Sequence, residues 1–422
     1  MNVGHVSFRL AGTDGVSLET AKLAQVLARM GHTNFYFAGE LDPPGAGAGP
    51  IQAPVAGGML IPEAHFTHPS ARWITEHAFG STQPHPELRV RLEALASLLE
   101  GALRRFIDHY HIEMLTVQNV FAIPMNLGLS VALQRVCADT GIPTIAHNHD
   151  FYWERERYAV HCVPDVLEQV FPPRLPNVHQ VVINTQAQRA LAARGIDSTC
   201  LPNIFDYSAP PPGPDAFNVD LRRELGLGAD ELFFLQPTRV IPRKGIELAI
   251  ELVRRLGDPR IKLIITHHAE YDSLPYLEEL LALAARAGVD LRYLPARFKP
   301  QRQPGEGIRK IYSLWDAYIC ADFVTYPSLY EGFGNALLET LYFRKPLLVN
   351  RYTVYREDIE PTGIQAVTLD GAVTDEAVEA VRHLLNSPRD VEQMTAHNYQ
   401  VGARHFSYEA AQAKLHDILA RF

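Results

Sequence analysis

The chain has little cysteine and contains no long apolar run. Its four cysteines are far apart and form no CxxC pair, so neither a disulfide framework nor a zinc site of that kind is expected. No apolar run approaches the ~18 residues that a membrane-spanning helix needs, and the first residues do not resemble a secretion signal. We therefore expect a protein of the reducing cytoplasm. The four cysteines are Cys137, Cys162, Cys200 and Cys320.

Positive charge is also scarce. The 422 residues include 39 Lys and Arg against 48 Asp and Glu, so the chain provides no general basic field for nucleic acid or an anionic membrane. Any phosphate binding must then be local. The sequence has no Asp-x-Asp pair to bridge a metal ion and no GxGxxG segment to hold a dinucleotide. We expect no required metal, no cofactor, and no nicotinamide or flavin chemistry.

Strand-like and helical segments alternate along the whole chain, and its length predicts about two or three domains. This alternation requires parallel sheets joined by right-handed crossovers. It predicts an α/β protein with two Rossmann-like, doubly wound domains that face a deep cleft. The proline-rich segment SAPPPGP, residues 208–214, is the best linker and puts the domain boundary near residue 206.

The segment YEGFGNALLE, residues 330–339, predicts a glycine loop followed by the start of a helix. Glu331 lies in the loop, and Glu339 lies about one turn into the helix that Asn335 would cap. Unpaired backbone N–H groups at such a helix start suit an anionic group, and two carboxylates beside it suit the hydroxyls of a sugar nucleotide. The alternative is a loop acid and a solvated helix acid. The candidate backbone donors are Gly334, Asn335, Ala336 and Leu337.

A second candidate site follows the first strand of the second domain, in TRVIPRKG. Arg239 and Lys244 stand here just before a helix. Two cations that converge at such a point would bind a diphosphate and stabilise the charge that develops on it as a glycosidic bond breaks. The alternative is a pair of surface charges, and Arg243 shows that not every cation of this segment need act.

The first domain opens with a strand at 2–8 and a turn that contains Gly12 and Gly15, whose amides would lie near a phosphate at a helix start. Residues 41–62 are rich in Pro, Gly and Ala without periodicity and predict a long loop. In the second domain we expect a helix over 305–314.

The strand at 141–151 ends in His147, Asn148, His149 and Asp150 and continues as FYWERERY. In α/β sheets, ligands bind at the carboxyl ends of the strands. A lone histidine there is more often structural, but a pair makes a functional role about as probable as a structural one. The pair is therefore a candidate part of the site.

Three segments, GTDG, RVIPRK and EGFGNALLE, occur in this order and resemble the retaining glycosyltransferases of the GT-B fold, family 4. That family includes glycogen-synthase-like, sucrose-phosphate-synthase-like and mannosyltransferase members. The resemblance implies two domains: 1–206 on the acceptor side, completed by a C-terminal helix at 406–422, and 207–405 for the nucleotide sugar. It also implies transfer of a hexosyl group from a nucleoside-diphosphate sugar with retention at the anomeric carbon.

The resemblance also implies roles for individual residues. Arg239 and Lys244 match the family's R-x4-K pair and would bind the diphosphate. Glu331 would lie beside the reacting sugar, where it holds hydroxyls or stabilises the transition state, and Glu339 would bind ribose. His149 would lie near the 6-hydroxyl of the donor sugar, with His147 as the reserve. The glycine loop that contains Gly15 would face the donor.

The acceptor is the least determined part of the prediction. Arg9, Arg155 and Arg157 could grip an acceptor phosphate beside aromatic surface. The alternative for the last two is ion pairing with Glu154 and Glu156. Our first expectation is glucosyl transfer from UDP-glucose to a small soluble sugar phosphate such as fructose 6-phosphate, as in sucrose-phosphate-synthase-like enzymes. The alternatives are a glycerate, glycan or lipid acceptor, or a sugar-nucleotide epimerase with this fold.

Overall fold

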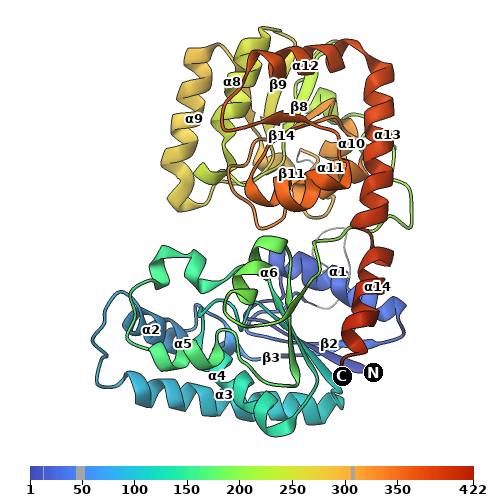
Figure 1. The fold of residues 1–422 in the computed structure, drawn as a ribbon. Coiled ribbons are helices and arrows are strands. Elements are labelled where there is room, and N and C mark those ends of the chain that lie inside the picture. Colours follow the sequence, from blue (N-terminus) through green and yellow to red (C-terminus); the bar gives the residue numbers. More distant parts are fainter. Residues whose placement is uncertain (13, 44–52, 306–308) are drawn as a thin grey trace. The chain divides into compact units, whose positions relative to one another are not determined.

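The computed structural model describes residues 1–12, 14–43, 53–305 and 309–422 (Figure 1). The chain forms two compact units, Met1–Asn203 with Ala411–Phe422, and Ile204–Ala410. The proline-rich segment 208–214 therefore lies within the second unit. Each unit contains its own parallel sheet, which is the pair of doubly wound α/β domains that the alternating pattern predicts.

The first unit is built on a seven-stranded sheet in the order β3-β2-β1-β4-β5-β6-β7, and all its pairings are parallel. Helices cover both faces of such a sheet, and its central strands are accordingly buried along their length. The strands are β1 (Asn2–Val6), β2 (Thr33–Ala38), β3 (Val55–Leu60), β4 (Met114–Gln118), β5 (Thr144–Asn148), β6 (Val178–Val182) and β7 (Ser198–Cys200).

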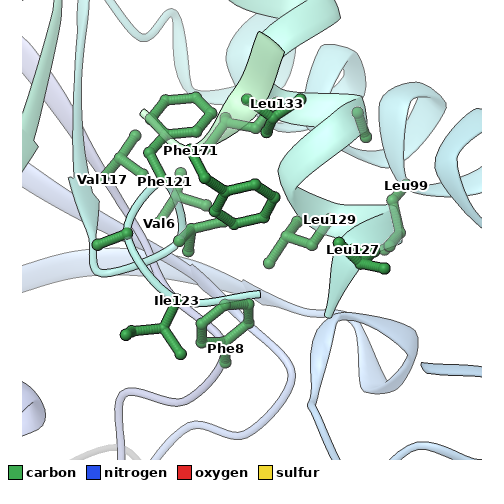
Figure 2. Packing of buried hydrophobic residues seen from close by; sticks show 14 of the residues in the cluster. Val6, Phe8, Leu99, Val117, Phe121, Ile123, Leu127, Leu129, Leu133 and Phe171 are labelled. Carbon is green, nitrogen blue, oxygen red and sulfur yellow. The ribbon is translucent and has the colours of Figure 1, made fainter. Parts of the chain in front are cut away.

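A large buried cluster of the first unit lies between this sheet and the helices α2 to α6. Val6 and Val117 from the sheet, Phe121 from the loop after β4, Leu133 from α4 and Phe171 all belong to one buried cluster (Figure 2). The helices of the unit are α1 (Gly15–Arg29), α2 (Pro69–Ala78), α3 (Leu88–Tyr110), α4 (Leu127–Thr140), α5 (Pro164–Val170), α6 (Thr185–Ala192) and the end of α14 (Tyr408–Leu419).

The second unit contains a six-stranded parallel sheet in the order β10-β9-β8-β13-β14-β15. Its core is another buried cluster, formed by these strands with α8, α9 and α12. The strands are β8 (Leu232–Gln236), β9 (Ile261–Ile265), β10 (Asp290–Tyr293), β13 (Phe323–Tyr326), β14 (Leu347–Asn350) and β15 (Val367–Leu369). A separate two-stranded ladder joins β11 (Phe298–Lys299) to β12 (Tyr312–Ser313).

The helices of the second unit are α7 (Leu221–Glu224), α8 (Ile246–Leu256), α9 (Leu274–Ala287), α10 (Leu314–Cys320), α11 (Asn335–Tyr342), α12 (Asp375–Asn386) and α13 (Pro388–His405). In each sheet the strand order reverses at one point, between β1 and β4 in the first unit and between β8 and β13 in the second. In doubly wound sheets, ligands bind at the carboxyl edge beside such a point.

Two predictions of local structure are wrong. Part of the loop expected at 41–62 is strand β3, whose alternating burial is typical of an edge strand. Residues 44–52 of that loop lie outside the described residues. The helix expected at 305–314 is not formed over 309–313, because β12 occupies 312–313 and α10 begins only at Leu314 behind a Ser313 capping box. Residues 306–308 also lie outside the described residues.

Candidate functional site

The strand reversal in the second unit brings Lys244 and Glu331 together. Lys244 ends the short 3-10 turn Pro242–Lys244 after β8, and Glu331 lies in the loop after β13, 87 positions along the chain. Because β8 and β13 are adjacent and parallel, their following loops meet at one edge. The Lys244 ammonium donates a hydrogen bond to Glu331 Oε1, and Arg243 Nη1 donates to Glu331 Oε2 at 2.8 Å. Two of the predicted site residues are therefore in direct contact.

Two glycines allow close packing around this contact. Gly245 has φ +59°, and a Cβ there would lie 2.5 Å from the carbonyl oxygen of Pro327. Gly334 has φ +129°, and a Cβ there would lie within 3 Å of the hydroxyls of Tyr326 and Tyr352. A side chain at Gly245 would push apart the segments that contain Lys244 and Glu331, and one at Gly334 would displace the two tyrosine hydroxyls from the start of α11.

The charges at this site are buried and tightly coupled. Burial opposes ionisation of Glu331, but Lys244 and Arg243 outweigh burial and hold the pKa of this carboxyl below its ordinary value. Burial also lowers the pKa of Lys244, against the raising effect of Glu331, and Arg243 and Arg239 lower it further. One carboxylate, that of Glu331, is thus bonded to two cations, Lys244 and Arg243, and this local excess of positive charge suits an anionic group such as a diphosphate.

Arg239 lies in the loop after β8 and is about half exposed, with Glu270 3.8 Å away. It also acts electrostatically on His267, at the end of β9, whose pKa is lowered to about 4 by burial, then by Lys244 and Arg239. His267 was not among the site residues predicted from the sequence, and no role was predicted for Arg243. The histidine pair His267–His268 directly after an apolar strand was the available signal.

The helix start at Gly334 differs from the predicted one. Gly334, not Asn335, is the N-cap of α11, and no side chain caps the helix. The N–H of Leu337 already donates to the Gly334 carbonyl at 3.1 Å, so it is not one of the unpaired donors that were expected. Glu339 is half-buried within α11, close enough to the buried Tyr318 to help raise the pKa of that phenol after burial, while the Tyr318 hydroxyl donates a hydrogen bond to the Ala336 carbonyl at 3.2 Å.

In the first unit, the predicted histidines lie at the carboxyl end of β5, beside the point of strand reversal. His147 is buried, and its Nδ1 lies 3.0 Å from Oε1 of Gln118, the last residue of β4. His149 is half-buried, and its Nε2 lies 3.4 Å from the same oxygen. Burial lowers the pKa of His149 to about 4 and that of His147 well below its ordinary value, with His149 as the second cause for His147. Both imidazoles are therefore neutral at physiological pH.

The three arginines proposed for the acceptor have different surroundings. Arg9 follows β1, with Asp14 3.2 Å away and the Phe66 ring 5.9 Å from its guanidinium carbon. Arg155 pairs with Asp150, five positions earlier in the chain. Arg157 is exposed and lies 4.5 Å from the ring of Tyr158. Of these three arginines, Arg9 lies nearest in sequence to the strand reversal of the first sheet, because it follows β1 by three residues.

Gly15 is exposed at the first position of α1, where Asp14 caps the helix and accepts hydrogen bonds from Val16 and Ser17. An added Cβ at Gly15 would meet no described atom within 4 Å, so the helix start is accessible from solvent. In the part of the chain that the structure describes, no group of three or more His, Cys, Asp or Glu is placed to hold a metal ion. Within the same residues, no helix is both long and apolar enough to cross a membrane.

Solved structures define the class of fold. A sucrose-phosphate synthase from Thermosynechococcus elongatus matches with a TM-score of 0.67 at 15% identity and covers 100% of this chain and 98% of that one. Anabaena HepE in complex with UDP and glucose matches with a TM-score of 0.65 at 14% identity, with 100% of both chains covered. The two parallel-sheet units therefore have the GT-B glycosyltransferase fold.

Sequence relatives define the family more narrowly. A family model described as glycosyl transferases group 1 matches residues 218–401. The mannosylglucosylglycerate synthase of Petrotoga mobilis is 32% identical over 392 residues, which cover 87% of this chain and 86% of that protein. The enzyme of the same name from Thermotoga maritima is 32% identical over 464 residues, with coverage of 100% and 99%. The chain belongs to the glycosyl transferases group 1 family and is a glycosyltransferase.

Proposed function

We propose that this glycosyltransferase transfers a mannosyl group from a nucleoside-diphosphate mannose to glucosylglycerate, with retention at the anomeric carbon. The observation that carries the proposal is the 32% identity, over nearly the full length of each protein, to two enzymes named mannosylglucosylglycerate synthase. Such an acceptor differs from our first expectation, fructose 6-phosphate, in that its anionic group is a carboxylate and not a phosphate. A guanidinium binds either group in the same bidentate manner.

In this proposal Lys244 and Arg239 bind the leaving diphosphate and stabilise its developing charge. In the second unit Lys244 is bonded to Glu331, so a bound diphosphate would draw the ammonium toward itself and loosen that pair. Glu331 would then be available to the hydroxyls of the reacting sugar or to its oxocarbenium-like transition state. Backbone donors at the start of α11 and the Glu339 carboxylate are assigned to the nucleotide, with Glu339 on the ribose.

Arg9 is proposed to bind the glycerate carboxylate. Arg9 is about one-third exposed, and one nitrogen of its guanidinium lies 3.2 Å from Asp14 at the start of α1. In Arg155, by contrast, two nitrogens already donate hydrogen bonds to Asp150. The second candidate function is glucosyl transfer from UDP-glucose to fructose 6-phosphate, in which the same arginine would bind the acceptor phosphate. The likeness to sucrose-phosphate synthase does not add support for it, because at 15% identity it concerns only the fold.

The test is a matrix of donors and acceptors, read as released nucleoside diphosphate. The donors are GDP-mannose, UDP-glucose and ADP-glucose. The acceptors are glucosylglycerate, its neutral analogue glucosylglycerol, glycerate, fructose 6-phosphate and fructose. We expect the highest kcat/KM for a mannosyl donor with glucosylglycerate, and NMR of the product should show the anomeric configuration of the donor. Preference for fructose 6-phosphate, or conversion of the donor without any acceptor, would overturn the proposal.

Two further arms sharpen the result. Arg9→Ala should raise KM for glucosylglycerate by at least about tenfold, because a charge-assisted hydrogen bond is lost, and should leave KM for glucosylglycerol unchanged. EDTA should leave the rate unchanged, since the cations that stabilise the diphosphate are proposed to be side chains. Loss of activity that Mg²⁺ restores would contradict that part.

A further inference from the structure

A buried chain of polar side chains runs across the first sheet and ends at the histidine pair. Asn34 on β2 donates from Nδ2 to the carbonyl oxygens of Ala24, at 2.9 Å, and Pro54, at 3.3 Å. Its amide oxygen therefore faces Nε2 of His5 on β1, 2.9 Å away. An amide oxygen can only accept, so the proton of the His5 imidazole lies on Nε2.

The direction of every following bond is determined by that proton. Burial lowers the pKa of His5 to about 4, so the ring is neutral and Nδ1 must accept the bond from the Thr116 hydroxyl at 2.7 Å. The Thr116 oxygen is then free to accept from Gln118 Nε2, 3.4 Å away. With its amide nitrogen directed at Thr116, Gln118 can offer only its oxygen to the histidines.

The oxygen of Gln118 faces a different nitrogen on each histidine. It lies 3.0 Å from Nδ1 of His147 and 3.4 Å from Nε2 of His149, and each of these nitrogens must carry a proton in order to donate. In a neutral imidazole the other nitrogen is then an acceptor. Nε2 of His147 is buried and has no hydrogen-bond partner among the residues that the structure describes.

We propose that Gln118 is a positioning residue that holds His147 and His149 in opposite tautomers and leaves Nε2 of His147 as an acceptor for a hydroxyl group of a bound sugar. Gln118 ends β4, where the strand order of the first sheet reverses and ligands bind in folds of this type. A buried acceptor without a partner is costly to keep, and a sugar hydroxyl is the donor that would satisfy it. This inference depends on the chain being a glycosyltransferase, but it does not depend on glucosylglycerate being the acceptor.

The kinetic test compares Gln118→Met with Gln118→Glu, using any donor and acceptor that the wild type converts. Methionine has a similar shape but cannot accept the imidazole protons, so kcat should fall by at least about tenfold at every pH. Glutamate still accepts both protons, but its charge raises the pKa of the histidines. Its activity relative to wild type should be near normal at pH 9 and fall as the pH approaches 6. The charged residues that follow the histidines in the chain, Asp150 and Arg155, pair with each other, so the carboxylate introduced at position 118 is the new charge that acts on the histidines.

Gln180→Met is the matched control. Gln180 is a buried amide on the neighbouring strand β6 that bonds Asn148 at 2.9 Å and the Pro173 carbonyl at 3.2 Å. Its loss removes a similar set of bonds, none of them to the histidines, so its kcat should stay near that of the wild type. If Gln180→Met lowers kcat as much as Gln118→Met does, or if Gln118→Glu is equally impaired at every pH, Gln118 is merely structural and the proposal is wrong.

A spectroscopic readout is independent of any acceptor. In the full chain labelled with 15N-histidine, the signals of the pair are assigned by their loss in His147→Gln and His149→Gln. We expect a proton on Nδ1 of His147 and on Nε2 of His149, and a change of the His147 tautomer in Gln118→Met. A proton on Nε2 of His147 in the wild type would refute the proposal. If no acceptor in the matrix is converted, the proposed function fails, while these spectra still decide the role of Gln118.

Discussion

The ion pair between Lys244 and Glu331 is better explained by function than by stability. Desolvation of two buried charges offsets most of their attraction, so buried pairs are often no more stabilising than apolar residues of the same size. Here the Glu331 carboxylate has two bonded cations, Lys244 and Arg243, while Arg239, which also affects the lysine, lies 3.8 Å from Glu270. The unmatched positive charge is available to a ligand, and an anionic ligand is what the family's donors provide.

Removal of Lys244 tests this explanation. Lys244→Ala should lower kcat by about 10²-fold or more through lost stabilisation of the leaving group. It should also raise the pKa of Glu331, because the carboxyl stays buried and loses its principal cation. The pKa of Glu331 is depressed in the folded wild type, so the stability that this gives is present above the ordinary carboxyl pKa and is lost as the pH falls through the depressed value. Kinetics and urea unfolding between pH 3 and 8 measure both effects.

The control is Lys262→Ala. Lys262 lies near the amino end of β9 and is largely buried, and it pairs with Glu231 at 3.3 Å and Asp290 at 3.1 Å. This variant also loses a paired lysine of the same sheet, but at the edge opposite the site. Its kcat should stay within about twofold of the wild type. Equal losses of activity in the two variants would show that Lys244 acts only through the fold.

The sequence indicated the important residue types at the site but not their partners. Arg239, Lys244 and Glu331 could be selected because each follows an apolar strand in a motif of recognisable spacing. The bond from Arg243 to Glu331 could not be predicted, because it depends on the register of two loops that are 88 positions apart. No sequence pattern indicated Gln118, because its proposed role depends on a chain of hydrogen bonds that also includes residues of β1, β2 and β5.

Among the elements, the turn at Gly245 controls the geometry of the site. This glycine ends the 3-10 turn that contains Lys244 and is also the N-cap of α8. Its left-handed conformation lets the chain turn directly from one helix type to the other, and the missing side chain lets the Pro327 carbonyl approach. The 3-10 turn Pro242–Lys244 can therefore hold Lys244 beside Glu331 only if residue 245 is glycine.

Gly245→Ala and Gly257→Ala form a matched pair that tests this turn. The two glycines flank α8 with φ +59° and +62°, but only at Gly245 would a Cβ meet another atom, while at Gly257 nothing described lies within 4 Å. Both variants should lose about 1–2 kcal/mol because alanine is strained in this conformation. Gly245→Ala should lose more and should also lower kcat. Denaturant unfolding and kinetics measure both quantities, and equal behaviour of the two variants would contradict the argument.

Element prediction worked where the hydrophobic pattern was strong and failed where it was weak. Buried strands such as β8 and β13 and the amphipathic helix α8 were evident as apolar runs bounded by turn residues. Helix α13 was not predicted, because its 18 residues are mostly polar and few of them are buried. Strand β3 was missed for a related reason, since Gly57 and Gly58 give an edge strand little β propensity.

At the scale of the whole molecule, the chain passes between the two units twice, after Asn203 and again within α14. The last residues of the chain belong to the first unit, where Leu415 and Ile418 are fully buried. Lys414 Nζ donates to the Cys200 carbonyl of β7 at 2.9 Å, and Arg421 lies 3.2 Å from Asp197. The C-terminal segment is thus a structural part of a unit whose other residues end about two hundred positions earlier.

Leu415→Ala should therefore destabilise the first unit in particular, by about 2–5 kcal/mol for a buried leucine that leaves a cavity. The three tryptophans of the chain allow each unit to be followed separately, since Trp73 and Trp153 lie in the first unit and Trp315 in the second. In a Trp315→Phe background, fluorescence reports on the first unit, and Leu415→Ala should lower its unfolding midpoint in urea. In a Trp73→Phe, Trp153→Phe background, the Trp315 transition should move less. His416→Ala, on the exposed side of the same helix, should change neither transition. An unchanged first-unit midpoint in Leu415→Ala would mean that the tail contributes nothing to that core, and that the returning helix is only a connection between the units.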